Sequence, residues 1–283
     1  MEYSKLIEEL SNNLKEKYNE YLDNRNEYLD SRIIRKINLT MSNACENEIA
    51  LLVSKVLNKD YNIIIDAYLS YTDENAKKRK NKTYRPDIIV IKTCKEHDNI
   101  VNEIVGIIEV KAQMGYTGIL TPDMYEYRLD RLKGNSICFS DEEYELLSKD
   151  ALKYYGKMGL TNEHKAIDYR ISDNLNIFVV NVMASNHSSN VEDTIACFDK
   201  KKSKVHFYTI YDNHIWYNKL SSEKLFELNK DEKLIDKEVK IIKINKNGLL
   251  EEQKKKISFK INKKVREEHG ISKFIDDIKG NIK

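Results

Sequence analysis

Three short apolar runs rich in β-branched residues follow one another between residues 61 and 112 of this chain of 283 residues. They read YNIIIDAYLSY (61–71), YRPDIIVIK (84–92) and EIVGIIEVKA (103–112), and charged segments separate them. Nearly continuous apolar runs of this length predict β-strands that are covered on both faces. The chain is therefore expected to build its core around a sheet with helices on either side.

Helical signals flank these strands. An apolar stripe with a period of three to four residues predicts a helix from about Ser42, and capping-box spacings predict helices at about 141–157 and 189–200. A further strand is expected at 176–185 and a hairpin at 205–217. The order αβββαβ, followed by more elements, predicts an α/β fold with a mixed central β-sheet flanked by helices.

The two ends of the chain differ from this central part. Leucines and tyrosines recur every four residues near the start, which predicts a helical arm. The end of the chain is rich in Lys and Glu and is expected to be helical in part. The predicted organisation is an N-terminal helical arm (1–41), a core (42–217) and a C-terminal, Lys-rich helical extension (218–283).

Composition excludes several classes of protein. The 48 basic and 46 acidic residues give a net charge of +2, which is unlike a histone-type polycation. The four cysteines include no CxxC pair, which argues against a zinc ribbon or a disulfide scaffold. No apolar run approaches the roughly 20 residues of a membrane helix, no secretory signal is visible, and no glycine-rich nucleotide-binding motif is present. We expect a reduced, cytoplasmic protein without membrane association or a nucleotide cofactor.

The near-neutral net charge hides local basic clusters. Segments rich in lysine occur at 200–204 and 254–266, and the densest cluster is the run KKRKNKTYR at 77–85. Clustered cations attract phosphate backbones whatever the base sequence. The predicted nucleic-acid-binding residues are Lys77, Lys78, Arg79, Lys80, Lys82 and Arg85.

Two carboxylates and a lysine lie on the second and third predicted strands. Asp87 follows Pro86 near the start of one strand, and Glu109 and Lys111 lie near the end of the next. Side chains alternate along a strand, so Glu109, Lys111 and Gln113 point to the same side. If the two strands pair as a hairpin, Asp87 faces Glu109 across the ladder.

Buried carboxylates need a partner charge or an ion. Oxygen ligands from Asp87 and Glu109 suit Mg²⁺, which shares phosphate oxygens with a substrate and lowers the pKa of a bound water. Lys111 would then position or deprotonate that water and neutralise developing charge. Glu48, on the edge of the helical stripe, is expected to support the site, and Gln113 to orient the water.

Pro86-Asp87 followed by Glu109-Val110-Lys111, with a helical glutamate upstream, resembles the PD-(D/E)XK nuclease superfamily, whose fold is restriction-endonuclease-like. The resemblance covers roughly residues 42–217. It implies metal ligation by Asp87, Glu109 and the Val110 carbonyl, with Lys111 as the catalytic lysine and Glu48 as the helix acid. It also implies Mg²⁺ as the cofactor, with Mn²⁺ as a substitute.

The leading hypothesis is a Mg²⁺-dependent endodeoxyribonuclease of type II restriction character that cuts double-stranded DNA as a homodimer. One alternative is a structure-directed nuclease of repair, junction processing or phage defence. Another, from a different class, is a catalytically silent nucleic-acid-binding module on the same fold.

Overall fold

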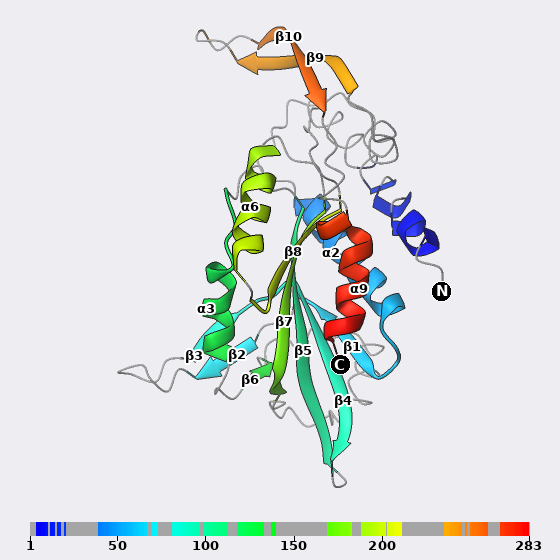
Figure 1. The fold of residues 1–283 in the computed structure, drawn as a ribbon, viewed down its shortest axis with the longest axis vertical. Coiled ribbons are helices and arrows are strands. Elements are labelled where there is room, and N and C mark those ends of the chain that lie inside the picture. Colours follow the sequence, from blue (N-terminus) through cyan, green and yellow to red (C-terminus); the bar gives the residue numbers. More distant parts are fainter. Residues whose placement is uncertain are drawn as a thin grey trace.

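A mixed β-sheet forms the centre of the computed structural model (Figure 1). Its main strands are β1 (Tyr61–Ile65), β4 (Ile88–Glu96), β5 (Asn99–Lys111), β7 (Tyr169–Asn181) and β8 (Val205–Thr209). The pairs β1–β4 and β4–β5 are antiparallel, whereas β5–β7 and β7–β8 are parallel. The structure describes residues 4–10, 12–14, 16–17, 20, 39–66, 69–72, 81–96, 99–112, 118–132, 137–139, 169–182, 188–201, 203–210, 235–244, 247, 250–259 and 267–282.

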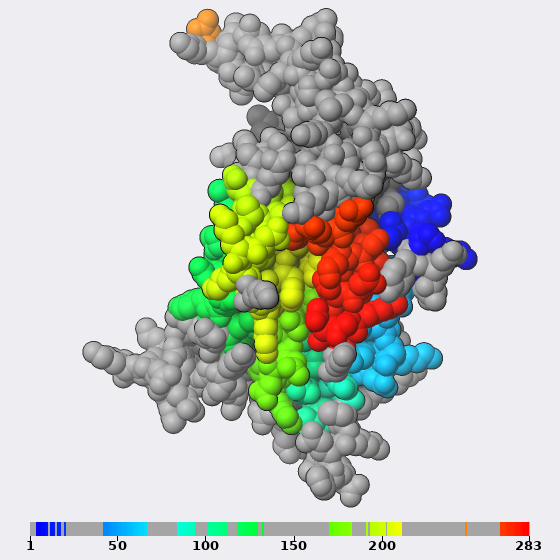
Figure 2. All heavy atoms as spheres, in the orientation of Figure 1, coloured from blue at the N-terminus to red at the C-terminus, as the bar shows by residue number. Residues whose placement is uncertain are grey.

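Helices cover both faces of this sheet. One face carries α2 (Leu39–Val56) and α9 (Ile271–Asn281), and the other carries α3 (Asp123–Leu132) and α6 (Ser188–Lys200). Alternate residues of each strand supply the two cores, as the pleat requires. Figure 2 shows α6 and α9 on either side of the β8 edge. The predicted α/β class, with a mixed central sheet flanked by helices, is confirmed.

The predicted strand 61–71 is wrong in one respect, because the structure divides it into two strands. Asp66 adopts a left-handed backbone conformation with φ 61°, which ends β1. Its N–H donates to the Asp87 carbonyl at 2.9 Å. The chain then forms β2 (Leu69–Thr72), which pairs with β3 (Asn81–Tyr84) and β6 (Ile137–Phe139). These three short strands join the main sheet where β6 meets the start of β7.

Other predicted elements have mixed outcomes. The helix expected at 189–200 is confirmed as α6, whereas the strand expected at 176–185 begins and ends earlier, at Tyr169–Asn181. Helix α3 was not predicted at all. The expected helix at 141–157 and the second half of the 205–217 hairpin lie outside the described residues.

The end of the chain contains both strands and a helix. Two antiparallel strands, β9 (Ile235–Ile244) and β10 (Leu250–Phe259), form a separate two-stranded sheet where partial helix was expected. Helix α9 supplies Phe274, Ile275 and Ile278 to the core beneath α2, and the N-terminal residues Leu6, Leu10 and Leu14 belong to the same cluster. The core is thus built from both ends of the chain as well as its middle.

Gly106 explains how closely the C-terminal segment approaches the sheet. A Cβ at this position would lie 2.8 Å from Cδ1 of Ile282, which is buried just after α9. Because Gly106 has no side chain, β5 leaves room for Ile282 at this position. Among the described residues, no helix has the length and apolar character needed to cross a membrane.

Candidate active site

The start of β4 and the end of β5 bring the predicted acidic residues together. Ile88 pairs with Ile108 in the antiparallel ladder, so the next position in register sets Asp87 opposite Glu109. The predicted hairpin pairing is confirmed. Glu109 and Lys111 lie at the carboxyl end of β5, beside the carboxyl end of the parallel strand β7. Ligands of α/β sheets bind characteristically at such an edge.

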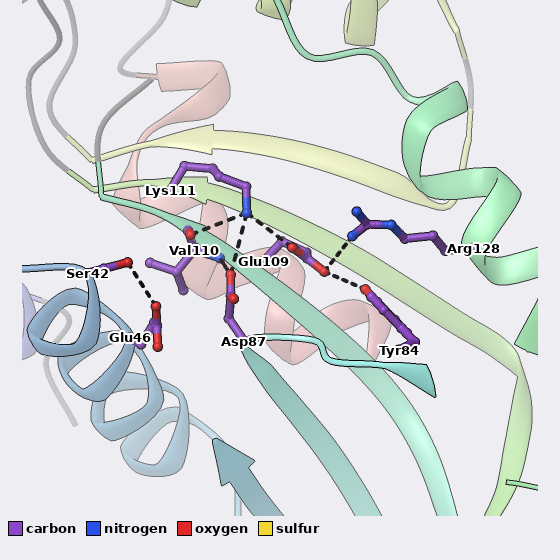
Figure 3. A network of polar contacts seen from close by, with 8 residues as sticks. All are labelled: Ser42, Glu46, Tyr84, Asp87, Glu109, Val110, Lys111 and Arg128. Carbon is purple, nitrogen blue, oxygen red and sulfur yellow. Dashed lines mark hydrogen bonds and ion pairs between the residues drawn. The ribbon is translucent and has the colours of Figure 1, made fainter. Parts of the chain in front are cut away.

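The Asp87 carboxylate is fixed by the backbone of the neighbouring strand. Its Oδ2 accepts a hydrogen bond of 2.6 Å from the N–H of Val110 (Figure 3). Burial raises the pKa of Asp87, and the nearby Lys111 ammonium opposes that effect only in part. The carboxylate is thus held in one orientation at a place where its negative charge is costly without a cation.

The Lys111 ammonium lies among three oxygen atoms. Its Nζ is 3.1 Å from Glu109 Oε2, 3.5 Å from the Val110 carbonyl and 3.6 Å from Asp87 Oδ2. Burial alone would lower the pKa of Lys111, but the carboxylates of Glu109 and Asp87 outweigh burial and raise it. The three oxygens predicted as metal ligands therefore converge on one positive charge (Figure 3).

Glu109 is the most enclosed acid of the site, with 4% of its surface exposed. Its Oε1 accepts hydrogen bonds from the Tyr84 hydroxyl at 2.5 Å and from Arg128 Nη1 at 2.9 Å, while Oε2 faces Lys111. Burial, with the charge of Glu109, raises the pKa of Tyr84 well above its usual value. Tyr84 therefore remains a neutral hydrogen-bond donor to this carboxylate.

Arg128 reaches the site from helix α3 and is held by two aromatic rings. Its guanidinium carbon lies 5.1 Å from the centre of the Tyr84 ring and 5.4 Å from that of Tyr125. Cation–π contacts at these distances orient a planar guanidinium. Sequence reasoning missed both Arg128 and Tyr84. Tyr84 lies in the run KKRKNKTYR, two residues before Pro86. Arg128 lies in a helix that the apolar periodicity of the sequence did not reveal.

The helix acid that faces the cluster is Glu46 and not Glu48. Glu46 is buried, accepts a hydrogen bond of 3.0 Å from Ser42, and lies beside Asp87 and Val110 in Figure 3. Burial, followed by the charge of Asp87, raises the pKa of Glu46. Glu48 instead accepts a hydrogen bond of 2.7 Å from Asn13. Two positions along a helix differ by about 200° in direction, so the two acids cannot share one side.

The structure describes only two of the remaining predicted residues. Arg85 forms an ion pair of 2.9 Å with Asp66, and Lys82 lies in β3, where only its backbone is described. The other predicted residues lie outside the described part of the chain: Gln113, Lys77, Lys78, Arg79 and Lys80.

A buried amide adjoins Lys111 on the next strand. Asn181 pairs in register with Lys111 on β5 and with Thr209 on β8, so the three side chains share one face. Asn181 Nδ2 donates to Thr209 Oγ1 at 3.1 Å, while its Oδ1 is buried without a hydrogen-bond partner. A buried acceptor of this kind is costly, and a donor at this edge would satisfy it.

The donor set of the site fits a hard divalent cation. Asp87, Glu109 and the Val110 carbonyl all offer oxygen, which is what Mg²⁺ and Mn²⁺ prefer. Elsewhere, Asp199, Glu268 and His269 form the one group of three possible ligands found close together among the described residues. His269 forms hydrogen bonds through Nδ1 to the Phe207 carbonyl and through Nε2 to Asp199. These contacts join α6, β8 and the helical residues before α9, and they account for the proximity of the three side chains.

Comparisons with models of known families, with curated proteins and with solved structures give no match.

Proposed function

We propose that this protein is a Mg²⁺-dependent endonuclease that hydrolyses phosphodiester bonds of double-stranded DNA. The convergence of Glu109 Oε2, the Val110 carbonyl and Asp87 Oδ2 on the single Lys111 ammonium carries the proposal. The three oxygens that surround the Lys111 ammonium can also coordinate a metal cation. A nearby lysine is then available for the phosphate and the attacking water.

The fold supports the same proposal. When the small strands β2, β3 and β6 are set aside, the chain has the element order αβββαβ. This order runs through α2, β1, β4, β5, α3 and β7. We propose that this is the core of a restriction-endonuclease-like domain. Asp87 and Glu109 then occupy the positions of the two acids in PD-(D/E)XK nucleases, Lys111 that of the lysine, and Glu46 that of the helix acid.

Each side chain has a role that follows from its contacts. A bound Mg²⁺ would supply a water of lowered pKa and neutralise charge on the phosphoryl group. The Val110 N–H orients Asp87, while Tyr84 and Arg128 orient Glu109. Lys111 lies within reach of both carboxylates, where it can donate to a phosphate oxygen or to the attacking water. Glu46 adds a second-layer carboxylate next to Asp87.

The test is cleavage of supercoiled, linear and branched DNA with Mg²⁺, with Mn²⁺ and with EDTA. The proteins compared are the wild type, Asp87→Ala, Lys111→Ala and, as a matched control, Lys273→Ala, which removes a lysine from α9 on the opposite face of the sheet. We expect metal-dependent cleavage by the wild type and the control only. A restriction-type enzyme that cuts both strands usually has two active sites, so the proposal includes a homodimer, which sedimentation measures.

The substrate form separates the competing functions. Discrete fragments from a closed circle support restriction-type cutting. An intact circle, together with cleavage of branched DNA, would instead support a structure-directed nuclease. Binding without cleavage by any of the proteins would contradict the enzyme and leave a nucleic-acid-binding module.

A further inference from the structure

Arg128 is a second cation of the site and differs from Lys111 in its surroundings. Lys111 lies on the inner side of Glu109, among three oxygens, and 22% of its side chain is exposed. Arg128 approaches the other carboxylate oxygen from α3, and 42% of its side chain is exposed. Figure 3 shows the guanidinium on the opposite side of Glu109 from the Asp87 and Val110 oxygens. Arg128 therefore stands between the acidic cluster and solvent.

The guanidinium is oriented independently of its ion pair. Tyr84 and Tyr125 both contact it through their rings, so its position does not depend on Glu109 alone. A guanidinium has five N–H donors in a fixed plane and binds phosphate through two of them at once. Met124 and Tyr127 on the same helix are exposed, so this part of α3 faces solvent beside Arg128. An anion can approach the guanidinium from that side.

The charges at Glu109 imply competition. Glu109 interacts with two cations, Lys111 and Arg128, and with the Tyr84 hydroxyl. A divalent cation that binds this carboxylate repels both positive side chains. The cation would also hold Asp87, the other carboxylate near Lys111. Within the described part of the chain, Glu109 is the carboxylate with which Arg128 pairs. The guanidinium, which is the more exposed of the two cations, then gains from a new anion.

We propose that Arg128 binds a phosphate of the DNA backbone next to the scissile bond, exchanging Glu109 for that phosphate when the cation binds. This inference rests on the proposed function and adds to it a substrate-binding residue outside the PD…EVK motif. Tyr84 and Tyr125 are positioning residues that keep the guanidinium plane in place during the exchange. The ion pair with Glu109 is the resting state of the same arginine.

The test measures binding of a fluorescent DNA duplex by anisotropy, once with Ca²⁺, an oxygen-preferring divalent cation, and once with EDTA. The variants are Arg128→Gln, Arg128→Lys and the control Lys273→Gln. Lys273 has 45% of its side chain exposed and is ion-paired with Asp277, so it matches Arg128 in exposure and pairing on the opposite face. Thermal unfolding of each variant verifies that it is folded.

With Ca²⁺, we expect Arg128→Gln to weaken binding roughly tenfold, the usual effect of a lost charged hydrogen bond. The slope of log affinity against log salt should fall by about one. In EDTA the loss should be smaller, because Glu109 then retains the arginine. Arg128→Lys should lose affinity as well, since an ammonium lacks the planar stacking, while Lys273→Gln should bind as the wild type does.

Calcium binding in the absence of DNA gives a second readout. Arg128→Gln should bind Ca²⁺ at least as tightly as the wild type, because a competitor for Glu109 has been removed. Wild-type DNA affinity in Arg128→Gln, or an equal loss with Ca²⁺ and EDTA, would overturn the exchange while leaving the nuclease intact. A wild type that neither binds nor cleaves DNA would instead overturn the proposed function.

Discussion

The backbone N–H of Val110 donates to the Asp87 carboxylate at 2.6 Å, across two strands that are adjacent in the sheet. This contact orients the first acid of the site through the backbone of the strand that carries the second acid and the lysine. The carboxylate direction therefore depends on strand register, and a slip of one residue would turn the side chains to the opposite face. The geometry of the site therefore depends directly on the pairing of β4 with β5.

Asp87→Asn should separate stability from function. The amide oxygen can still accept from the Val110 N–H, while the negative charge is removed. Since burial raises the pKa of Asp87, its charge is unfavourable in the folded state, and the variant should unfold at the same or a higher temperature. Its Mg²⁺ affinity and cleavage should fall at least about 100-fold. Calorimetry and a DNA cleavage assay measure the two effects, and a destabilised variant with intact cleavage would contradict this view.

Glu46→Gln and Glu48→Gln form a matched pair on one helix. Glu46 is electrostatically coupled to Asp87, whereas Glu48 is bonded to Asn13 on the other side of α2. We expect Glu46→Gln to reduce Mg²⁺-dependent cleavage about 10-fold or more, as loss of a second-layer group does. Glu48→Gln should remain within about twofold of the wild type, a difference within the effect of an ordinary surface change. The reverse pattern would restore Glu48 as the helix acid.

Gly106→Ala should destabilise the protein through Ile282. The added Cβ would lie 2.8 Å from Ile282 Cδ1, and overpacking of this kind costs about 1–3 kcal/mol. Ile282→Ala alone should cost about 2–5 kcal/mol by leaving a cavity. The double variant should cost less than the sum of the two, because the smaller side chain leaves room for the new methyl group. Urea unfolding of all four proteins measures the coupling, and strict additivity would argue against this contact.

His206 should make stability depend on pH in a defined direction. Its ring stacks on Phe178, its Nε2 contacts Asn176 Oδ1 at 3.2 Å, and burial lowers its pKa below the usual value. The unfolded chain therefore binds the proton more tightly than the folded protein. Stability attributable to His206 is retained above about pH 6.5, the usual histidine pKa, and lost as the pH falls below it. His206→Gln should remove this part of the pH dependence in unfolding experiments between pH 5 and pH 8.

The residues of the site that the sequence did not predict were missed for one reason. Helix α3 packs on the face of the sheet that carries Glu109, so Arg128 meets Glu109 and Tyr84 through packing and not through sequence proximity. Its pattern, DMYEYRLDRL, is weakly apolar, because only one face of the helix is buried. Asn181 likewise lies beside Lys111 only because β7 pairs with β5. No local signal marks such residues.

The sequence by itself determined the strands of the site and the faces of their side chains. Strand periodicity is two, so the spacing of Glu109 and Lys111 sets both on one face, and a hairpin between adjacent strands leaves little choice of partner for Asp87. The tertiary structure alone decided between Glu46 and Glu48 and brought Arg128 to Glu109. The rotation of a helix about its axis, and the residues that it meets, depend on packing against the whole core, which local periodicity does not encode.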